Sequence, residues 1–146
     1  MQSREYREYL ALAPGNRVHY VDLLGVPYRK DGRDKSGMDC SGVCAEVLRR
    51  LGHDVPEAAW SLRWDPVGGE LVTPDCWERV GSGYMDATQV GDILASDPGG
   101  MGLASHVSIV TAPRYCTVVS AHEEVGVYVS KSYATRNVVG AYRFSG

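Results

Sequence analysis

The clearest helical pattern in the chain follows Asp39. Cysteine and aliphatic residues recur at positions 40, 44, 47, 48 and 51, a spacing that places them on one face of an α-helix. Asp39 is a favourable N-cap, two arginines occupy the last turn, and Gly52 fits the position just past the helix end. The pattern therefore predicts a helix from residue 40 to 51 with a buried apolar face.

Two shorter helices are predicted before it. Ser3 can cap a helix that runs to about residue 13, where Pro14-Gly15 stops it. Asn16 can cap a second helix over residues 17–24. The polar stretch of residues 29–37 predicts a loop.

Residues 53–90 show no sustained period and contain all three tryptophans. We expect an irregular connection with one short helix near residues 76–80. Trp60, Trp64 and Trp77 could line a substrate groove by stacking on flat groups, or they could form a local core. We favour the local core, because tryptophan is buried on average.

From Gly91 onward the hydrophobic period changes to two, which is typical of strands. Helices first and strands last predict an α+β fold with an antiparallel sheet, and 146 residues fit a single domain, 1–146. The expected strands cover residues 92–96, 106–111, 116–122, 125–130 and 138–144.

Composition narrows the class of protein. Apolar residues make up 44% of the chain, which excludes a disordered chain, and the net charge of −3 gives no nucleic-acid footprint. No apolar run approaches the roughly 20 residues that span a bilayer, and the first residues carry no apolar signal core. We expect a soluble, uncleaved chain without a membrane span.

The four cysteines match no four-ligand zinc spacing, and a chain of this length does not need disulfides, so we expect free thiols rather than a disulfide framework. Cys40 is the candidate nucleophile, because the positive end of a helix favours a thiolate and lowers a cysteine pKa. The alternative is that Cys40 is simply a small buried residue.

A thiol nucleophile needs a base, and the base needs a residue that orients it. His106 begins one predicted strand, and His122 ends the next. Strand alternation places Ser120 and His122 on one face, so either could reach the far ring nitrogen of His106. His19 and His53 are assigned to surface or capping roles.

Four sequence blocks together resemble the NlpC family of cell-wall cysteine peptidases. The blocks are Leu24-Gly25-Val26-Pro27-Tyr28, Gly37-Met38-Asp39-Cys40-Ser41-Gly42-Val43, Gly91-Asp92-Ile93-Leu94 and Ser105-His106-Val107-Ser108-Ile109-Val110. Before the cysteine, Gly25-Val26-Pro27-Tyr28 and Gly32-Arg33-Asp34 are most similar to the family members found in bacteriophage tail and lysis proteins. The resemblance implies a papain-like fold, with N-terminal helices and a nucleophile helix packed on a five- to six-stranded antiparallel sheet.

The same resemblance implies roles for individual residues. Cys40 would be the nucleophile and His106 the general base. Tyr28 would help the oxyanion or the substrate, while Asp39 and Ser41 match residues that contact the amino end of the stem peptide. Asp39 is also the expected helix cap, and that role competes with contact to the stem peptide.

The chain departs from the family pattern at two positions. Ser108 replaces the usual glycine after His-Val and puts a hydroxyl beside the base. The usual third histidine position falls on Ser120, whereas the available imidazole is His122. We expect His122 to orient His106, with Ser120 as the alternative; a backbone bulge between them would favour Ser120.

The function that the resemblance implies is peptidoglycan hydrolysis at a stem-peptide amide, often the bond between D-glutamate and a diamino acid. This thiol chemistry needs no metal or organic cofactor. Other chemistries on the same fold, an amidase or acyltransferase, and a non-catalytic phage tail or wall-docking module are the alternatives. Without a signal sequence, such an enzyme would reach the wall through a virion, through lysis, by a dedicated export route, or as part of a larger protein.

Overall fold

The structure is a computed structural model of the chain and describes residues 4, 7, 18–65, 67–81, 88–97, 106–135 and 137–146. Its central helix, α2 (Cys40–Arg50), forms where the sequence predicts it. The side chain of Asp39 accepts a hydrogen bond from the backbone N–H of Gly42 at 2.7 Å, which caps the helix start. Gly52, at φ +94°, takes the left-handed conformation that ends the helix.

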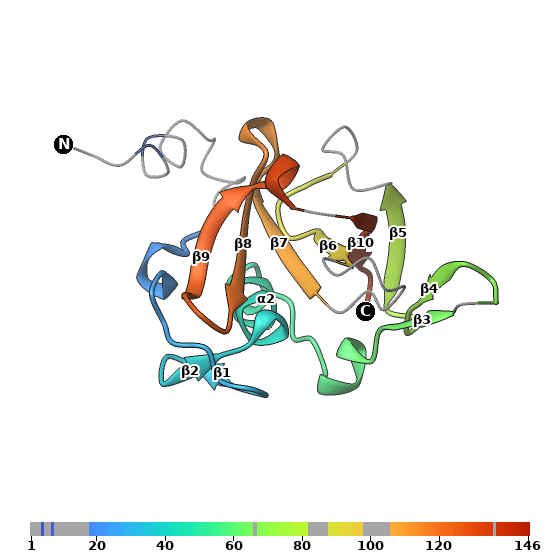
Figure 1. Cartoon of the computed structure of the whole chain (residues 1–146), viewed down its shortest axis with the longest axis horizontal. Helices are drawn as coiled ribbons and strands as arrows, with labels where there is room; N and C mark the ends of the chain where they lie inside the picture. Colours follow the sequence, from blue (N-terminus) through green and yellow to red (C-terminus); the bar gives the residue numbers. More distant parts are fainter. Residues whose placement is uncertain are drawn as a thin grey trace.

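A six-stranded antiparallel sheet forms the body of the molecule (Figure 1). The predicted α+β class is therefore confirmed. In spatial order the strands are β5 (Trp77–Gly81), β10 (Val138–Phe144), β6 (Ile93–Ser96), β7 (His106–Ala112), β8 (Thr117–His122) and β9 (Gly126–Lys131). The 3-10 helix η4 (Pro113–Tyr115) connects β7 to β8, and η5 (Ser132–Ala134) follows β9.

Helix α2 packs on β7 and β8, and this contact builds the main core. Val47 and Leu48 of the helix are buried in one cluster with Ile93, Ile109 and Val119 of the sheet. A smaller cluster contains Leu94, Val110, Val118 and Ala141, the residues that alternate with the first set along the strands. The sheet thus buries both faces around its middle strands.

Two predicted helices are corrected by the structure. Residues 76–80 form strand β5, because they pair with the edge of β10 and bury Trp77. Of the predicted helix 17–24, the described part contains only the single turn η2 (Val21–Leu23). The chain then turns at Gly25, whose N–H donates to Val127 O, and runs along β9 instead of coiling further. The predicted helix 3–13 lies largely outside the described residues.

The tryptophans Trp60 and Trp77 form the expected local core. Their rings lie 5.3 Å apart, and Trp77 also packs edge-on against Phe144. The indole N–H of Trp77 donates to the carbonyl of Ala59 in the 3-10 helix η3 (Glu57–Trp60). Trp64 lies apart from this pair in the hairpin β3–β4 (Arg63–Asp65, Glu70–Val72), which projects to one side in Figure 1.

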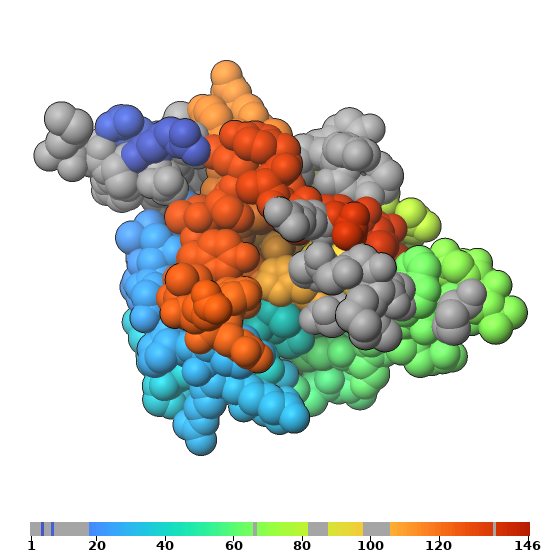
Figure 2. Space-filling model, in the orientation of Figure 1, coloured from blue at the N-terminus to red at the C-terminus, as the bar shows by residue number. Residues whose placement is uncertain are grey.

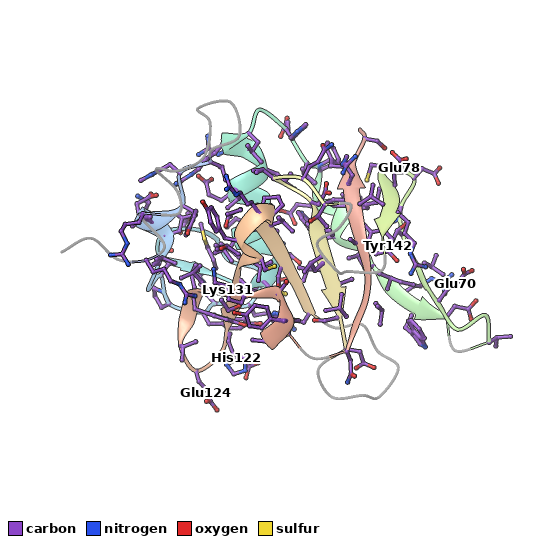
Figure 3. All side chains as sticks on the ribbon, turned by 90° about the horizontal axis from the view of Figure 1, so that it is seen from above. Glu70, Glu78, His122, Glu124, Lys131 and Tyr142 are labelled. Atoms are coloured by element: carbon purple, nitrogen blue, oxygen red, sulfur yellow. The ribbon has the colours of Figure 1, made fainter. Side chains whose placement is uncertain are left out.

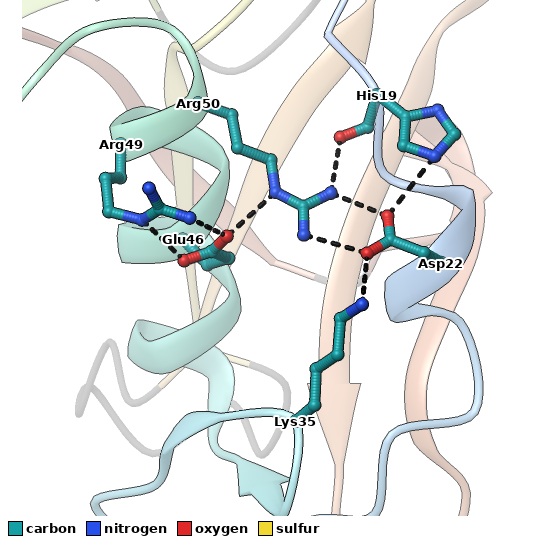
Figure 4. A network of polar contacts seen from close by, with 6 residues as sticks. All are labelled: His19, Asp22, Lys35, Glu46, Arg49 and Arg50. Carbon is teal, nitrogen blue, oxygen red and sulfur yellow. Dashed lines mark hydrogen bonds and ion pairs between the residues drawn. The ribbon is translucent and has the colours of Figure 1, made fainter.

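A polar network holds the segment before α2 against the helix (Figure 4). Arg50 of α2 donates to both carboxylate oxygens of Asp22 and to the carbonyl of His19. Lys35 binds Asp22 from the hairpin β1–β2 (Arg33–Asp34, Gly37–Met38), and Arg49 and Arg50 share Glu46. In Figure 2 this N-terminal segment, in blue, and the orange β8–β9 hairpin form one continuous surface.

No described helix is long and apolar enough to cross a membrane.

Candidate active site

Cys40 is the first residue of α2 and is half-buried against the start of β7. The backbone N–H of Val107 and both the backbone and the hydroxyl of Ser41 hydrogen-bond to its sulfur, which favours the thiolate. Burial has the opposite effect and is larger, so the pKa of the Cys40 thiol lies above its ordinary value. The nearby charge of Asp39 raises this pKa further. The lowered pKa expected from the helix start alone is therefore not what the structure gives.

The side chain of His106 is held by Ser120. The His106 Nε2 and Ser120 Oγ atoms lie 2.9 Å apart, and Ser120 Oγ donates to the carbonyl of Val107 at 2.8 Å. Because a hydroxyl has one hydrogen and the carbonyl can only accept, Ser120 must accept from the ring. The proton of the neutral imidazole is therefore on Nε2, and Nδ1 is left with the lone pair that a base needs.

The protonation state of His106 suits a general base. Burial, followed by the charge that His122 can carry, lowers the pKa of His106 below its ordinary value of 6.5. At neutral pH the imidazole is consequently uncharged and can accept a proton. Together with the raised thiol pKa, this describes a resting site in which both Cys40 and His106 are neutral.

The predicted contact between His122 and His106 is corrected by the structure. His122 is exposed, and its Nδ1 accepts a hydrogen bond from the backbone N–H of Glu124 at 3.2 Å. Figure 3 shows His122 and Glu124 at the edge of the molecule. Among the described residues, the ring of His106 hydrogen-bonds to Ser120 instead.

Strand geometry explains this choice without a bulge in the β8–β9 pairing, which is regular through His122. The β7–β8 pairing ends at Ile109 and Val119, before it reaches His106. Continued in register, it would put His122 opposite His106. Because the pairing stops there, the ring of His106 reaches diagonally to Ser120, whose buried hydroxyl satisfies both the ring and a carbonyl.

Ser108, the residue that replaces a glycine of the family pattern, is buried on the same face of β7 as His106. It lies opposite Leu94 of β6. Among the described residues, it makes no hydrogen bond with the ring of His106, so its hydroxyl does not replace Ser120.

Tyr28 ends the segment of residues 25–28, called the strap below, whose backbone is hydrogen-bonded to its neighbours on both sides. Pro27 O accepts from Met38 N–H, and Val26 O accepts from Val127 N–H of β9. Gly126 allows this approach, since a Cβ there would lie 2.2 Å from Val26 O. Burial, the charge that Cys40 carries as a thiolate and the charge of Asp39 raise the pKa of Tyr28, so its hydroxyl stays protonated and able to donate a hydrogen bond.

Asp39 serves as the helix cap, as expected, and its carboxylate is heavily occupied. Oδ1 accepts from Gly42 N–H and from Arg33 Nη1, both at 2.7 Å, while Oδ2 accepts from Asp31 N–H at 2.8 Å. Ser41 follows Cys40 in the first turn and contributes its hydrogen bonds to the sulfur.

Asp92 of the Gly-Asp block has a structural role. It is buried and forms a two-pronged ion pair with Arg143 of β10, with both N···O distances 2.9 Å. This pair ties the start of β6 to its neighbouring strand.

Sequence reasoning missed two residues near the thiol. Tyr128 lies opposite Ser120 on β9, and burial, followed by the charge that Cys40 carries as a thiolate, raises the pKa of Tyr128. Once the register of the β8–β9 hairpin is known, strand alternation places Tyr128 beside Ser120 and so identifies it. Arg33 was part of a stretch predicted only as a loop, and no local pattern marks its contact with Asp39.

All four cysteines are free thiols, as expected. Among the described residues, no three His, Cys, Asp or Glu side chains gather closely enough to hold a metal ion.

The sequence also resembles a known protein family. A sequence profile of the NlpC/P60 family matches residues 25–143. No curated protein sequence matches the chain closely enough to count as a relative.

Three solved structures share the fold. An NLP/P60-family protein of Staphylococcus aureus, described as similar to a lipoprotein, is 22% identical over 86% of this chain, with a TM-score of 0.55. An NLPC/P60-family protein of Bacillus cereus is 19% identical over 85% of the chain, also with a TM-score of 0.55. The chain spans only 39% and 37% of these two proteins. The NlpC/p60 domain of the peptidoglycan hydrolase SagA is 25% identical over 82% of this chain and 88% of that domain, with a TM-score of 0.52.

Proposed function

The chain belongs to the NlpC/P60 family of cysteine peptidases, which act on peptidoglycan, and from this premise we propose that it cleaves an amide bond in the peptidoglycan stem peptide. The proposed bond is the one between D-glutamate and the following diamino acid. One observation supports the assignment of the site: a half-buried thiol at a helix start accepts from the backbone N–H of Val107, the residue after a neutral histidine whose ring is oriented by a buried serine.

In the proposed reaction, Cys40 is the nucleophile and His106 is the general base. Nδ1 of His106 accepts the thiol proton as the sulfur attacks the amide carbonyl. The imidazolium that forms still donates from Nε2 to Ser120, so Ser120 stabilises the charged ring. We assign the positioning role to Ser120 and not to His122.

The second half of the cycle regenerates the thiol. The C–N bond of the tetrahedral intermediate breaks, and His106 gives its proton to the leaving amine, which leaves a thioester on Cys40. Water, deprotonated by His106, then attacks the thioester carbonyl. The C–S bond breaks, the sulfur takes the proton back from His106, and the peptide is released as its carboxylate. The hydroxyl of Tyr28 and backbone N–H groups at the helix start are proposed to stabilise the oxyanion in both steps.

Substrate contact around the thiol is proposed for Tyr28, Asp39 and Ser41. Asp39 has little free capacity, because three donors already occupy its carboxylate. Any contact that it makes with an amino end must therefore share those acceptor positions.

Delivery to the wall is also part of the proposal. A virion, a lysis step, a dedicated export route or a place within a larger protein are the candidate routes.

The test is digestion of purified peptidoglycan, read by turbidity and by mass spectrometry of the released muropeptides. We expect Cys40→Ala and His106→Gln to lower the rate at least about a thousandfold while the fold persists. Cys76→Ala, at another half-buried free thiol, and His53→Gln, at an exposed ring, are the matched controls and should stay near the wild-type rate. Undiminished digestion by the Cys40 variant would refute the mechanism, and products cut at another bond would refute the proposed specificity.

A further inference from the structure

The cap of the nucleophile helix creates an electrostatic conflict. Asp39 must be a carboxylate to accept from Gly42 N–H with full strength, yet its negative charge lies next to a thiol that must become negative during the reaction. Its side chain is only 14% exposed, so water screens that charge poorly. A compensating positive charge at Asp39 would remove the conflict.

Arg33 supplies that charge. Its Nη1 donates to Asp39 Oδ1 at 2.7 Å and to the carbonyl of Gly32 at 3.0 Å. Its Nε and Nη2 donate to the two carboxylate oxygens of Glu57, at 2.8 and 3.0 Å. The planar guanidinium thus makes a two-pronged bond to Glu57 and a further bond to Asp39, an arrangement that the single ammonium of a lysine does not reproduce.

The two carboxylates differ in their surroundings. The side chain of Glu57 is 70% exposed and can be hydrated, whereas that of Asp39 is mostly buried. The attraction of Arg33 to Asp39 is therefore the less screened of the two. Glu57 acts mainly as the holder that fixes the direction of the guanidinium.

Close packing keeps Arg33 at the helix start. A Cβ at Gly42 would lie 2.0 Å from the carbonyl oxygen of Gly32 and 3.2 Å from Nη1 of Arg33. The glycine two residues after the nucleophile is therefore required for the loop that carries Arg33 to touch the first turn of α2.

We propose that Arg33 is a positioning residue for the Cys40 nucleophile: its guanidinium balances the carboxylate of Asp39 at the first turn of α2, and Glu57 holds the guanidinium there. This inference rests on the proposed function, because it gives Arg33 a purpose only if Cys40 reacts as a thiolate. It assigns a role to a residue that touches neither the sulfur nor the scissile bond.

The experiment measures the rate of Cys40 alkylation by iodoacetamide from pH 7 to 11.5, with mass spectrometry of the Cys40 peptide separating it from the other thiols. In Arg33→Gln the midpoint should rise by about one pH unit, so that alkylation below the midpoint becomes about tenfold slower. Arg33→Lys, which keeps the charge, should restore part of the loss. Arg49→Gln removes the same charge from an exposed ion pair with Glu46 elsewhere on α2 and is the matched control.

Glu57→Gln separates charge balance from simple tethering. The amide keeps one acceptor for Arg33 and removes a negative charge, so the midpoint should not rise. The proposal is overturned if Arg33→Gln shifts the midpoint no further than Arg49→Gln, or if Glu57→Gln raises it as much as Arg33→Gln does. Thermal unfolding of each variant identifies any that fail to fold, and in that case the Lys and Glu57 variants decide.

The same variants are assayed on peptidoglycan. A wild-type protein that alkylates with the expected Arg33 dependence but releases no muropeptides would contradict the proposed function and leave the charge balance standing. Digestion that depends on Cys40 without any Arg33 effect on alkylation would do the reverse.

Discussion

Removal of the Ser120 hydroxyl is the sharpest test of how the base is held. Ser120→Ala deletes the acceptor of His106 Nε2–H and the donor to Val107 O in one step, at a side chain that is 1% exposed. Water cannot readily replace these bonds at such a site. His122→Ala, by contrast, removes an exposed ring whose hydrogen bond runs to Glu124 N–H.

The magnitude follows from the charge on the ring. A hydrogen bond to a charged group is worth about 1.5–3 kcal/mol, and the ring of His106 is charged only after it takes the thiol proton. At about 1.4 kcal/mol per decade of rate, Ser120→Ala should lower kcat/KM about 10- to 100-fold. His122→Ala should change it by less than about threefold, because an exposed bond contributes little.

The two variants also move the pH profile in opposite directions. Ser120 stabilises the imidazolium as an acceptor, so its loss should lower the pKa of His106 and move the acid limb of kcat/KM to lower pH. The charge of His122 lowers the pKa of His106, so its loss should move the acid limb to higher pH. Muropeptide release measured from pH 5 to 8 gives both the rate and the limb.

The reasoning is refuted if His122→Ala costs more activity than Ser120→Ala, or if both variants move the acid limb the same way. Ser120→Asn, whose amide oxygen can accept from the ring, should recover part of the lost rate if the hydrogen bond is the cause.

Two further predictions concern stability. Gly126→Ala combines a φ of +74° with a Cβ 2.2 Å from Val26 O, so it should lower the free energy of unfolding by more than about 2 kcal/mol and reduce activity through the Tyr28 strap. Gly52→Ala, at φ +94° with open space around it, should cost only about 1 kcal/mol and keep activity; equal costs in urea unfolding would contradict the steric argument. Because the folded-state pKa of His106 is depressed, the unfolded chain binds more protons below pH 6.5, so stability should fall as the pH drops below that value. His106→Gln should flatten this dependence in urea unfolding at pH 5.5 and 7.5, and an unchanged slope would count against a buried neutral ring.

Local sequence patterns were sufficient to predict the nucleophile helix and most strands of the sheet. The cap, the i, i+4 spacing and the terminal glycine of α2 are interactions between residues close in sequence, so they could be recognised without knowledge of the fold. Strand β10 was predicted with the bounds that the structure has, and β7, β8 and β9 to within a residue or two at each end, because alternation is a property of each strand alone.

Tertiary pairing overrode local preference in two places. Residues 76–80 have no strong period, and they become β5 because β10 offers an edge and Trp77 fills a hole beside Trp60 and Phe144. The segment after η2 is extended because Gly25 and Val26 form backbone hydrogen bonds with Val127 of β9. Neither partner can be identified from the segment's own residues.

Caps, hydrophobic periods and motif order are properties of the linear sequence, so they were enough to predict the nucleophile helix, the alternating strands, and Cys40 and His106 as the candidate catalytic pair. The sequence could not choose between Ser120 and His122, since alternation puts both on one face of β8. That choice depended on where the β7–β8 pairing ends. The raised pKa of the Cys40 thiol and the contact of Arg33 with Asp39 were likewise decided only by the tertiary structure, because burial and charge at a site are set by segments far apart in sequence.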